Sequence, residues 1–454
     1  MKMIVVGCGK IGISIISSLV AEGHDVVAID DDPAVIEEIT NIYDAMGVCG
    51  NGADNDALRE AGVSDCEVFV AVTGSDETNM LSCFIAKRLG AKHTIARIRN
   101  PEYNDDSLGF LCQQLGLSSA INPDLLGAQE INDILKFPGA VNVEKFSRRR
   151  IEMVEIVLKP DCSVNGMALH EFRRQYSSKF LVCAVQRDGE VHIPGGSFVL
   201  EAGDRVALTA SPAEIQKLLK KLGILQKQAK NVMILGAGNT AYYLAKMLVS
   251  AGSSVKIIEK DEARCREICE SLPEAVVIHG DGAKQEILSE EGLASVDAFV
   301  ALTGTDEQNI LISIFAASTG VPKVIAKVSR PELAVMAEKL GLECVVSPRR
   351  SVSSVITRYA RAVQNTLGSN VETLHRIMDG KAEVLEFNVS EDFAYNGVPL
   401  KEMKLKPDVL VAGIIRGRKT IIPAGDDFIA SGDKVIVLAA GQILGDLGDI
   451  AVKQ

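Results

Sequence analysis

The residues with the clearest chemical meaning form a glycine loop near the N-terminus, Gly7-Cys8-Gly9-Lys10-Ile11-Gly12. An apolar strand over residues 2–6 should lead into this loop, and a helix over 10–22 should follow it. In a Gly-x-Gly-x-x-Gly loop the first glycine permits a tight turn, the second lets the backbone approach a pyrophosphate, and the third allows helix and strand to pack closely. The anion is held by free N–H groups at the start of the helix. Such a loop predicts a site for the adenosine half of a dinucleotide.

An acidic residue completes this pattern. Asp30 ends the next expected strand, residues 25–30, and lies 18 residues beyond Gly12. A carboxylate at this place accepts hydrogen bonds from ribose hydroxyls and repels a 2′-phosphate. The pair of features therefore favours NAD over NADP.

The same features occur a second time. Gly236-Ala237-Gly238-Asn239-Thr240-Ala241 repeats the loop with the permitted alanine at the last position, and Glu259 takes the place of Asp30. Asn239 and Thr240 stand where Lys10 and Ile11 stand in the first copy, so the two pockets need not prefer the same ligand. Lys10 either places a cation beside the phosphates or is simply solvated.

Further candidates follow the later strands. Thr73-Gly74 and Thr303-Gly304 come after the fourth strand of each copy, at the sheet edge where open α/β folds place ligands. Arg97 and Lys327 end the fifth strand, where each either reaches a phosphate or is a surface cation paired with Asp76 or Asp306. Asn51 and Asp281, each between two glycines, should line the adenine side.

Catalytic and metal-binding patterns are missing from the sequence. The six histidines do not repeat at matching places, and no nucleophile, base or paired carboxylates show a recognisable spacing. The closest cysteines, Cys265 and Cys269, lack the second pair or nearby histidines of a metal site. We therefore assign no catalytic residue and no metal ligand, and expect a regulator rather than an enzyme.

The elements that position these residues form an internal repeat. Ala71-Val72-Thr73-Gly74-Ser75-Asp76-Glu77 returns 230 residues later as Ala301-Leu302-Thr303-Gly304-Thr305-Asp306-Glu307. Strands alternate with helices in each large unit, which predicts parallel Rossmann-like doubly wound sheets, and a smaller α+β module follows each. We predict domains at residues 1–122, 140–224, 230–347 and 370–454, with a polar linker over 217–230.

Composition sets the class of protein. The chain has 454 residues, 47% of them hydrophobic, and a formal net charge of −12, so a nucleic-acid binder is not expected. The apolar runs are strand-sized and far short of the roughly 20 residues that span a bilayer. No signal peptide pattern opens the chain, and we expect a cytoplasmic protein.

These motifs together resemble the RCK, or KTN, nucleotide-binding domain of potassium transport regulators. The resemblance is carried by both glycine loops and their acids, by the stretch Ala71 to Asn79, and by Ile95-Ala96-Arg97. The small modules, with Gly195-Gly196 and Gly203-Asp204, resemble the RCK C-terminal domain.

The resemblance implies a function. The chain would be a cytoplasmic regulatory subunit, peripheral on the inner face of the membrane, that binds NAD(H) or the adenine nucleotides ATP and ADP. It would assemble as a homotetramer and gate a membrane potassium-translocating subunit of the Trk type. The contacts carried over are those of the first loop and its edge (Gly7, Cys8, Gly9, Lys10, Ile11, Gly12, Asp30, Thr73, Gly74, Arg97) and of the second (Gly236, Ala237, Gly238, Asn239, Thr240, Glu259, Asp281, Thr303, Gly304, Lys327).

Two other functions stay open on the sequence. One is an NAD-dependent oxidoreductase, and the other is a regulator of a different cation transporter. The choice between NADH and ATP in the first pocket is also open, because Asn51 replaces the acidic residue that the second copy keeps at Asp281. Short arginine runs at 148–150 and 349–350 either meet acidic lipid or a partner, or form a solvated face, which we favour.

Overall fold

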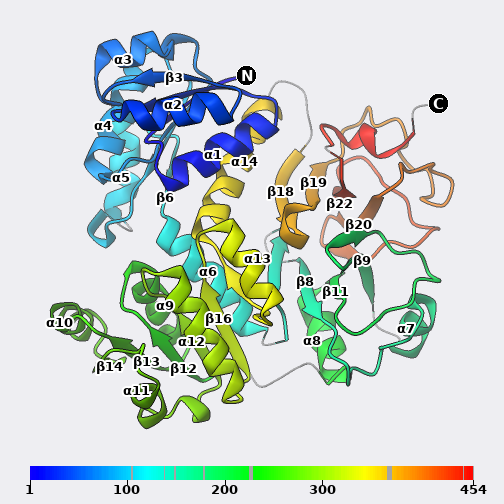
Figure 1. Cartoon of the computed structure of the whole chain (residues 1–454). Coiled ribbons are helices and arrows are strands. Elements are labelled where there is room, and N and C mark those ends of the chain that lie inside the picture. The colour runs from blue at the N-terminus through cyan, green and yellow to red at the C-terminus, as the bar shows by residue number, and fades with distance from the viewer. Residues whose placement is uncertain are drawn as a thin grey trace.

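The computed structural model describes residues 1–103, 106–137, 139–147, 150–176, 179–223, 229–365, 371–442 and 444–452. Figure 1 shows two larger bodies, one blue and one green, on one side of the molecule and two smaller bodies on the other. Among the described residues, no helix has the length and apolar character needed to cross a bilayer. The domain limits given above stay predictions.

The first large body is built on a six-stranded parallel sheet of strand order β3-β2-β1-β4-β5-β6. The inner strands are fully buried Val, Ile, Phe and Ala, as expected for a parallel sheet covered on both faces. The reversal of strand order between β1 and β4 places the glycine loop at the crevice where ligands bind in this fold. Its elements are β1 Lys2–Val6, α1 Lys10–Ala21, β2 Asp25–Asp30, α2 Pro33–Ile42, β3 Ala45–Cys49, α3 Asn55–Glu60, β4 Val68–Ala71, α4 Asp76–Leu89, β5 His93–Arg97, α5 Asp106–Leu115 and β6 Ser119–Ile121.

The second large body repeats this topology as β14-β13-β12-β15-β16-β17, again wholly parallel. The predicted tandem of Rossmann-like sheets is therefore confirmed. Its elements are β12 Asn231–Leu235, α9 Asn239–Ser250, β13 Ser254–Glu259, α10 Glu262–Ser271, β14 Val276–His279, α11 Gln285–Glu290, β15 Ala298–Ala301, α12 Asp306–Ser318, β16 Lys323–Lys327, α13 Pro331–Lys339 and β17 Val345–Val346.

The two small bodies contain antiparallel five-stranded sheets, ordered β10-β9-β11-β8-β7 and β18-β19-β22-β20-β21. The first has β7 Asn142–Phe146, β8 Ile151–Val157, α7 Leu169–Tyr176, β9 Phe180–Arg187, β10 Glu190–His192, β11 Arg205–Ala210 and α8 Pro212–Lys221. The second has β18 Val371–Ile377, β19 Ala382–Asn388, β20 Val409–Arg416, β21 Lys419–Ile421 and β22 Lys434–Ala440, with short 3-10 turns but no α-helix among its described residues.

The sequence prediction differed from the small bodies in two places. The edge strand β7 was not predicted, because its alternation of polar and apolar residues is short and lies beside the predicted domain boundary. The expected linker at 217–230 begins too early, since α8 continues through Lys221. The later residues 224–228 lie outside the described residues.

The aspartate of the repeated Gly-Asp motif in the small bodies has a structural role. Asp204 is 1% exposed and accepts two hydrogen bonds of 2.7 Å from the Arg187 guanidinium. Asp433 and Arg416 repeat this bidentate pair in the second small body. Each pair closes the loop before the last sheet strand. The two sheets then share one apolar core, to which both contribute, including Phe146, Ile151, Val384 and Leu438.

Two long helices cross between the halves, which no sequence pattern had predicted. Helix α6, Pro123–Lys136, follows the first sheet but packs on α9 of the second, where Ala128, Ile131 and Leu135 join one core with Leu244 and Leu248. In Figure 1 this cyan helix lies against the green body. These apolar positions recur at helical spacing, so one face of α6 is buried by the other half.

Helix α14, Pro348–Asn365, makes the reciprocal crossing. It follows the second sheet and packs on α1 of the first, with Val352, Ile356 and Ala360 fully buried against Ile15 and Leu19. The yellow α14 reaches the blue body in Figure 1. The two halves are thus interlocked through an exchange of helices.

Ionic contacts fix the far end of α14. The Arg361 guanidinium, 8% exposed, pairs with Glu22 at the end of α1 at 2.6 Å and with Glu383 on β19 at 3.1 Å. Because these charges are buried, each must be paired to be tolerated. Arg361 therefore joins the first large body to the second small body through the crossing helix.

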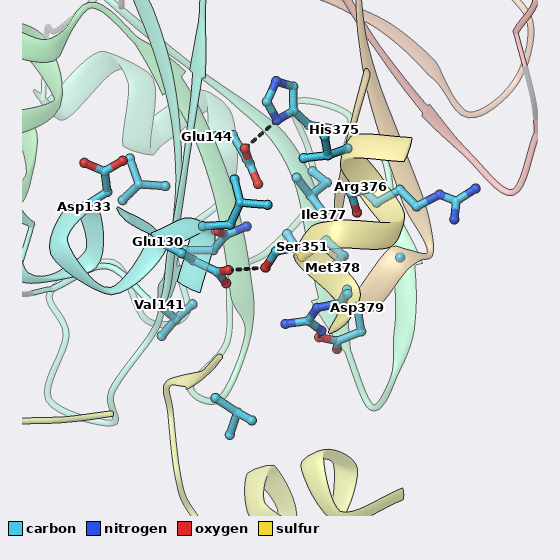
Figure 2. Close-up of a pocket in the computed structure, with 18 of the residues that line it drawn as sticks. Glu130, Asp133, Val141, Glu144, Ser351, His375, Arg376, Ile377, Met378 and Asp379 are labelled. Atoms are coloured by element: carbon cyan, nitrogen blue, oxygen red, sulfur yellow. Dashed lines mark hydrogen bonds and ion pairs between the residues drawn. The ribbon is translucent and has the colours of Figure 1, made fainter. Parts of the chain in front are cut away.

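A cavity of about 220 Å³ lies where both crossing helices meet β7 and β18. Figure 2 shows two carboxylates reaching into it, Glu144 toward His375 at 2.5 Å and Glu130 toward the Ser351 hydroxyl at 2.7 Å. Burial raises the pKa of Glu130, and Arg350 and Ser351 offset this only in part. Burial alone would also raise the pKa of Glu144, but the pairing and hydrogen bond with His375, together with the Arg358 guanidinium, hold it below its ordinary value.

These opposite pKa shifts predict opposite effects on stability. A carboxyl whose pKa is higher in the folded than in the unfolded chain stabilises the fold while it is protonated, and loses that contribution as pH rises through the folded-state pKa. Ionised Glu130 therefore opposes folding at neutral pH. We expect Glu130→Gln to raise the free energy of unfolding at pH 7 by on the order of 1 kcal/mol. Glu144→Gln should lower the free energy of unfolding at pH 7 by about 1.5–3 kcal/mol. A carboxyl whose pKa is lowered on folding stabilises the fold at every pH above its unfolded-state pKa, and the substitution removes that contribution.

Denaturant unfolding at pH 7 and at about pH 4 measures both effects. Both differences from the wild type should shrink at the lower pH, since the two carboxylates are then increasingly protonated in the unfolded chain. Equal destabilisation by the two substitutions at pH 7 would contradict the assignment for Glu130.

Candidate functional site

The first candidate pocket is a cavity of about 860 Å³ at the carboxyl ends of the first sheet's strands. Its size is in the range of small-molecule and cofactor sites. Eight predicted residues line it: Gly7, Gly9, Lys10, Ile11, Asp30, Thr73, Gly74 and Arg97. Asn51 lines it as well.

Cys8 and Gly12 do not line this pocket but shape its wall. The Cys8 side chain is 1% exposed and faces the Ile29 carbonyl, and burial beside Asp30 raises the pKa of its thiol to about 12. A Cβ on Gly12 would lie 2.0 Å from the Gly7 carbonyl oxygen. Both positions therefore allow the close packing of α1 against the loop.

The other two loop glycines have different physical roles. Gly7 has φ +87°, and a Cβ there would lie 2.7 Å from the backbone of Thr73, so only glycine fits this turn. Gly9 has an ordinary extended backbone, with φ −67°, and a Cβ would meet nothing within 4 Å. The space over Gly9 opens into the pocket and is where a phosphate would approach the N-terminus of α1.

The strand-ending acids hold the glycine loops in place. One oxygen of Asp30 accepts a hydrogen bond of 2.6 Å from the Cys8 backbone N–H, and the other accepts from Asp32 N–H at 3.1 Å. Glu259 accepts in the same way from Ala237 N–H at 2.7 Å. A ribose would have to share oxygens that already bind the backbone, a role that the sequence did not reveal.

Two buried asparagines connect the ends of neighbouring strands. Asn79, fully buried, accepts from Thr73 N–H at 2.7 Å and donates to the Arg97 carbonyl at 3.0 Å. Asn309 repeats both bonds with Thr303 and Lys327. The asparagines thereby fix the pocket edge formed by β4 and β5, and by β15 and β16.

Arg97 and Lys327 lie at this edge without the acidic partners that the alternative interpretation required. Asp76 instead accepts from the backbone N–H groups of Arg99 and Asn100, and Asp306 pairs with Arg330. The Arg97 Nε is buried and has no hydrogen-bond partner among the described residues. Burial lowers the pKa of both Arg97 and Lys327, a cost that a bound anion would offset.

The second pocket, about 560 Å³, is lined by all ten residues expected of it (Gly236, Ala237, Gly238, Asn239, Thr240, Glu259, Asp281, Thr303, Gly304, Lys327). Sequence reasoning missed Arg264 on α10, whose Nε donates to the Ala237 carbonyl at 2.7 Å. Arg264 corresponds to Val35 in the repeat, so self-similarity gave no signal for it.

Sequence reasoning also missed a wall that the two pockets share. Asp124, on the first turn of α6, accepts from Arg99 Nε at 2.8 Å with one oxygen and from Thr240 Oγ1 at 2.8 Å with the other. All three residues line both cavities. Asp124 is brought there by the crossing of α6, so only tertiary structure could reveal it.

The start of α14 also enters the first pocket. Pro348 and Arg349 line this cavity, whereas Arg350 lines the smaller cavity of Figure 2. The preferred interpretation of 349–350 as a solvated face is wrong for Arg349. Of the other arginine run, residues 148 and 149 lie outside the described residues, and Arg150 donates to the Gly417 carbonyl.

The glycine geometry gives a test of each pocket. Gly9→Leu and Gly238→Leu should place a side chain in the phosphate space while costing about 1 kcal/mol or less of stability, because both are extended N-cap positions with open space. Each should abolish NADH binding at its own pocket in calorimetric titration. Gly7→Ala should instead destabilise the fold by roughly 1–3 kcal/mol. Wild-type NADH binding by both leucine variants would exclude these pockets.

Family models match most of the chain. The TrkA-N domain model matches residues 3–123 and 232–348, and the TrkA-C domain model matches 153–223 and 384–451. Each segment covers most of one large or one small body, and the edge strands β7 and β18 precede the TrkA-C segments. The predicted RCK-type tandem repeat is thereby confirmed.

Solved structures share the fold. The RCK domain of GsuK superposes with a TM-score of 0.62 at 17% identity, over 97% of this chain and 92% of that one. The GsuK channel bound to NAD gives a TM-score of 0.62 at 16% identity, over 97% of this chain and 77% of that one.

Relatives match nearly the full length. The Trk system potassium uptake protein TrkA homolog of Archaeoglobus fulgidus is 34% identical, and TrkA homolog 1 of Methanosarcina mazei is 31% identical, each over 97% of both chains. TrkA of Haemophilus influenzae is 30% identical over 96% of this chain and 95% of that one. The domains of this chain, their order and these full-length relatives together show that the chain belongs to the TrkA family.

Proposed function

We propose that this protein is the regulatory subunit of a potassium uptake system, and that it gates a membrane potassium-translocating partner of the Trk type in response to NAD(H) or adenine nucleotides. The observation that carries the proposal is the pair of glycine-loop pockets, one at the carboxyl edge of each parallel sheet. The names of the relatives and the NAD-bound GsuK channel of the same fold support it.

The crossing helices offer a physical route from nucleotide to partner. The first pocket touches Pro348 and Arg349 at the start of α14, and α14 is tied to the small bodies through Arg361 and Glu383. The second pocket touches Asp124 at the start of α6, which leads directly into β7. A ligand that prefers one placement of these helices would shift the arrangement of the small bodies.

The pocket linings favour binding over redox chemistry. Both consist of glycine backbone, hydroxyls, cations and the acids that hold the loops. None of the six histidines, all of which are described, lines either cavity. An oxidoreductase would still need a group that exchanges a proton with its substrate.

Asp30 provides the test of ligand class. Asp30→Asn keeps an oxygen for the Cys8 N–H but removes the charge, so NADH affinity should fall by about 1.5–3 kcal/mol, roughly 10- to 100-fold. NADPH should lose less, because the repulsion of its 2′-phosphate is relieved at the same time. Calorimetry in the Gly238→Leu background isolates the first pocket, and Glu259→Gln in the Gly9→Leu background is the matched experiment for the second.

Unchanged NADH affinity in both acid variants would remove these residues from the site. The oxidoreductase alternative has its own assay, the absorbance of NADH at about 340 nm with a panel of carbonyl compounds. We expect no change in that absorbance, and oxidation proportional to protein and substrate would replace the regulatory proposal.

Exposed apolar side chains support self-association. Leu81 on α4 and Leu311 on α12 occupy equivalent positions and are 51% and 67% exposed. Phe110 on α5 and Leu340 after α13 form a second equivalent pair, 62% and 52% exposed. Exposed apolar residues repeated at equivalent positions of both large bodies are suited to contacts between such bodies.

We therefore expect a homotetramer that co-purifies with a Trk-type membrane subunit. Light scattering should give four chains for the wild type and fewer for the combined variant Phe110→Glu and Leu340→Glu. Ile42→Glu serves as the control, because Ile42 is comparably exposed but corresponds to the polar Ser271 in the repeat. A wild-type monomer that ignores nucleotide and retains no Trk-type subunit would leave only the fold and family. Retention of a different cation transporter would favour the second alternative.

A further inference from the structure

The cavity of Figure 2 shares no lining residue with either glycine-loop pocket. Its wall comes from both crossing helices, α6 and α14, and from the edge strands β7 and β18 of the two small bodies. With a volume of about 220 Å³ it is smaller than the roughly 300–1,000 Å³ of a site for a cofactor or a drug-sized molecule. The cavity therefore suits a ligand of only a few heavy atoms.

Most acidic groups around this cavity already have a basic partner within the protein. Three such pairs are Glu144 with His375, Asp133 with Lys145, and Asp379 with Arg205. Glu130 and Glu338 form no ion pair among the described residues, and burial raises the pKa of both carboxyl groups. The shift favours their neutral forms. The negative charge of the lining is thus largely offset before any ligand enters.

Helix α14 presents a row of hydrogen-bond donors to the same cavity. Arg350, Ser354 and Arg358 line it at a spacing of four residues, so they lie on successive turns of the helix. Within the described part of the chain, Arg358 and the Ser354 hydroxyl have no hydrogen bond or ion pair, and Arg350 has only Asp379 at 4.0 Å. Burial lowers the pKa of Arg358, opposed by the charge of Glu144. A poorly paired cation in such a place is costly unless an anion reaches it.

This row belongs to α14 and has no counterpart on α6. Both helices begin with a proline, Pro123 and Pro348. Counted from these prolines, the equivalent positions are Leu125 and Arg350, Gln129 and Ser354, and Asp133 and Arg358. The Asp133 carboxylate is neutralised by Lys145, whereas the guanidinium at the equivalent position of α14 is not paired. Only one of the two crossing helices therefore brings unsatisfied charge to the cavity.

We propose that this cavity binds a small dicarboxylate, with one carboxylate on Arg350, the other on Arg358, and the Ser354 hydroxyl between them. A planar guanidinium pairs with a carboxylate through two parallel hydrogen bonds. The two arginines stand roughly 12 Å apart along the helix axis. That separation suits a ligand with a charge at each end better than one compact anion.

Inorganic phosphate fits the same lining less well. Figure 2 shows Glu144 and Glu130 reaching into the cavity from the side of β7 and α6. A phosphate concentrates up to two negative charges on one atom group, which would lie beside these carboxyl groups. A dicarboxylate instead places its charges at its two ends, each against a guanidinium, and only its uncharged middle lies between them.

An occupied cavity would hold both halves of the chain together. The ligand would contact α14 and lie against α6, β7 and β18, so it would favour one placement of the crossing helices relative to the small bodies. Arg349, the residue next to Arg350, lines the first glycine-loop pocket. The dicarboxylate is therefore placed to change nucleotide affinity. This coupling rests on the proposed function, whereas dicarboxylate binding does not.

Calorimetric titration of the full chain with succinate, at constant ionic strength set with sodium chloride, tests the site. Arg358→Gln and Arg350→Gln should each weaken succinate about tenfold or more, as expected for the loss of a charge-assisted contact. Arg358→Lys should recover part of the affinity, because it keeps the charge without the planar fork. Arg349→Gln, on the same helix but facing the first pocket, is the matched control and should leave succinate affinity unchanged.

A second variant should tighten binding, which a folding defect cannot do. Glu130→Gln keeps an acceptor for the Ser351 hydroxyl and removes a carboxylate charge from the cavity wall. Succinate affinity at pH 7 should therefore rise several-fold in this variant. An unchanged or weaker affinity would contradict the placement of the ligand beside Glu130.

Three results would overturn the dicarboxylate site: no succinate binding by the wild type, equal affinity in Arg358→Gln, or phosphate binding that Arg358→Gln weakens as much as it weakens succinate. Titrations with NADH, with and without saturating succinate, then measure the coupling. NADH affinity should change by about fivefold or more in the wild type and stay constant in Arg358→Gln. The same NADH affinity in both conditions would refute the coupling alone. A wild type that binds succinate but no nucleotide would refute the proposed function and leave the site standing.

Discussion

The structure depends on one packing constraint, the need to cover the outer faces of α1 and α9. Each of these helices opens with a glycine loop and has one face on its own sheet, which leaves an apolar face to be buried. Ile15 and Leu19 on α1 are covered by α14, and Leu244 and Leu248 on α9 are covered by α6. Since each covering helix comes from the other half, neither half completes its core alone. The two copies of the repeat therefore form one interlocked structure.

This exchange also connects the pockets to the rest of the molecule. Both covering helices begin at a pocket, α6 with Asp124 and α14 with Arg349, and both contact an edge strand of a small body, β7 or β18. The buried contacts of Arg361 with Glu22 and Glu383 show how firmly the far end of α14 is held. Removing one partner of a buried ion pair leaves an uncompensated charge, so these contacts hold the helix end in one place.

The pockets are organised before any ligand arrives. The acids Asp30 and Glu259 bind the loop N–H groups, and Asn79 and Asn309 fix the strand ends, so the backbone has little freedom left to lose on binding. What remains unsatisfied is chiefly cationic, and it is concentrated in the first pocket. Duplication thus supplied two equal frameworks, and charge substitutions at a few positions made their linings different.

The sequence by itself determined the local features. The glycine loops, the strand-ending acids, the alternation of strands and helices and the repeat predicted both parallel sheets, and they placed all but two of the proposed contacts on a pocket wall. These features were readable because backbone geometry fixes them within a few residues: Gly7 needs a positive φ, and Asp30 must end the strand beside it. Only the tertiary structure decided that Asp30 binds its own loop, that α6 and α14 change partners, and that Asp124, Arg99 and Arg349 enter the pockets. The helix crossings join residues more than a hundred positions apart across two copies of one pattern, and an amphipathic helix is equally compatible with the apolar face of its own half or of the other. The Asp30 contact is local, but an acid at a strand end is equally compatible with a ribose and with the loop backbone.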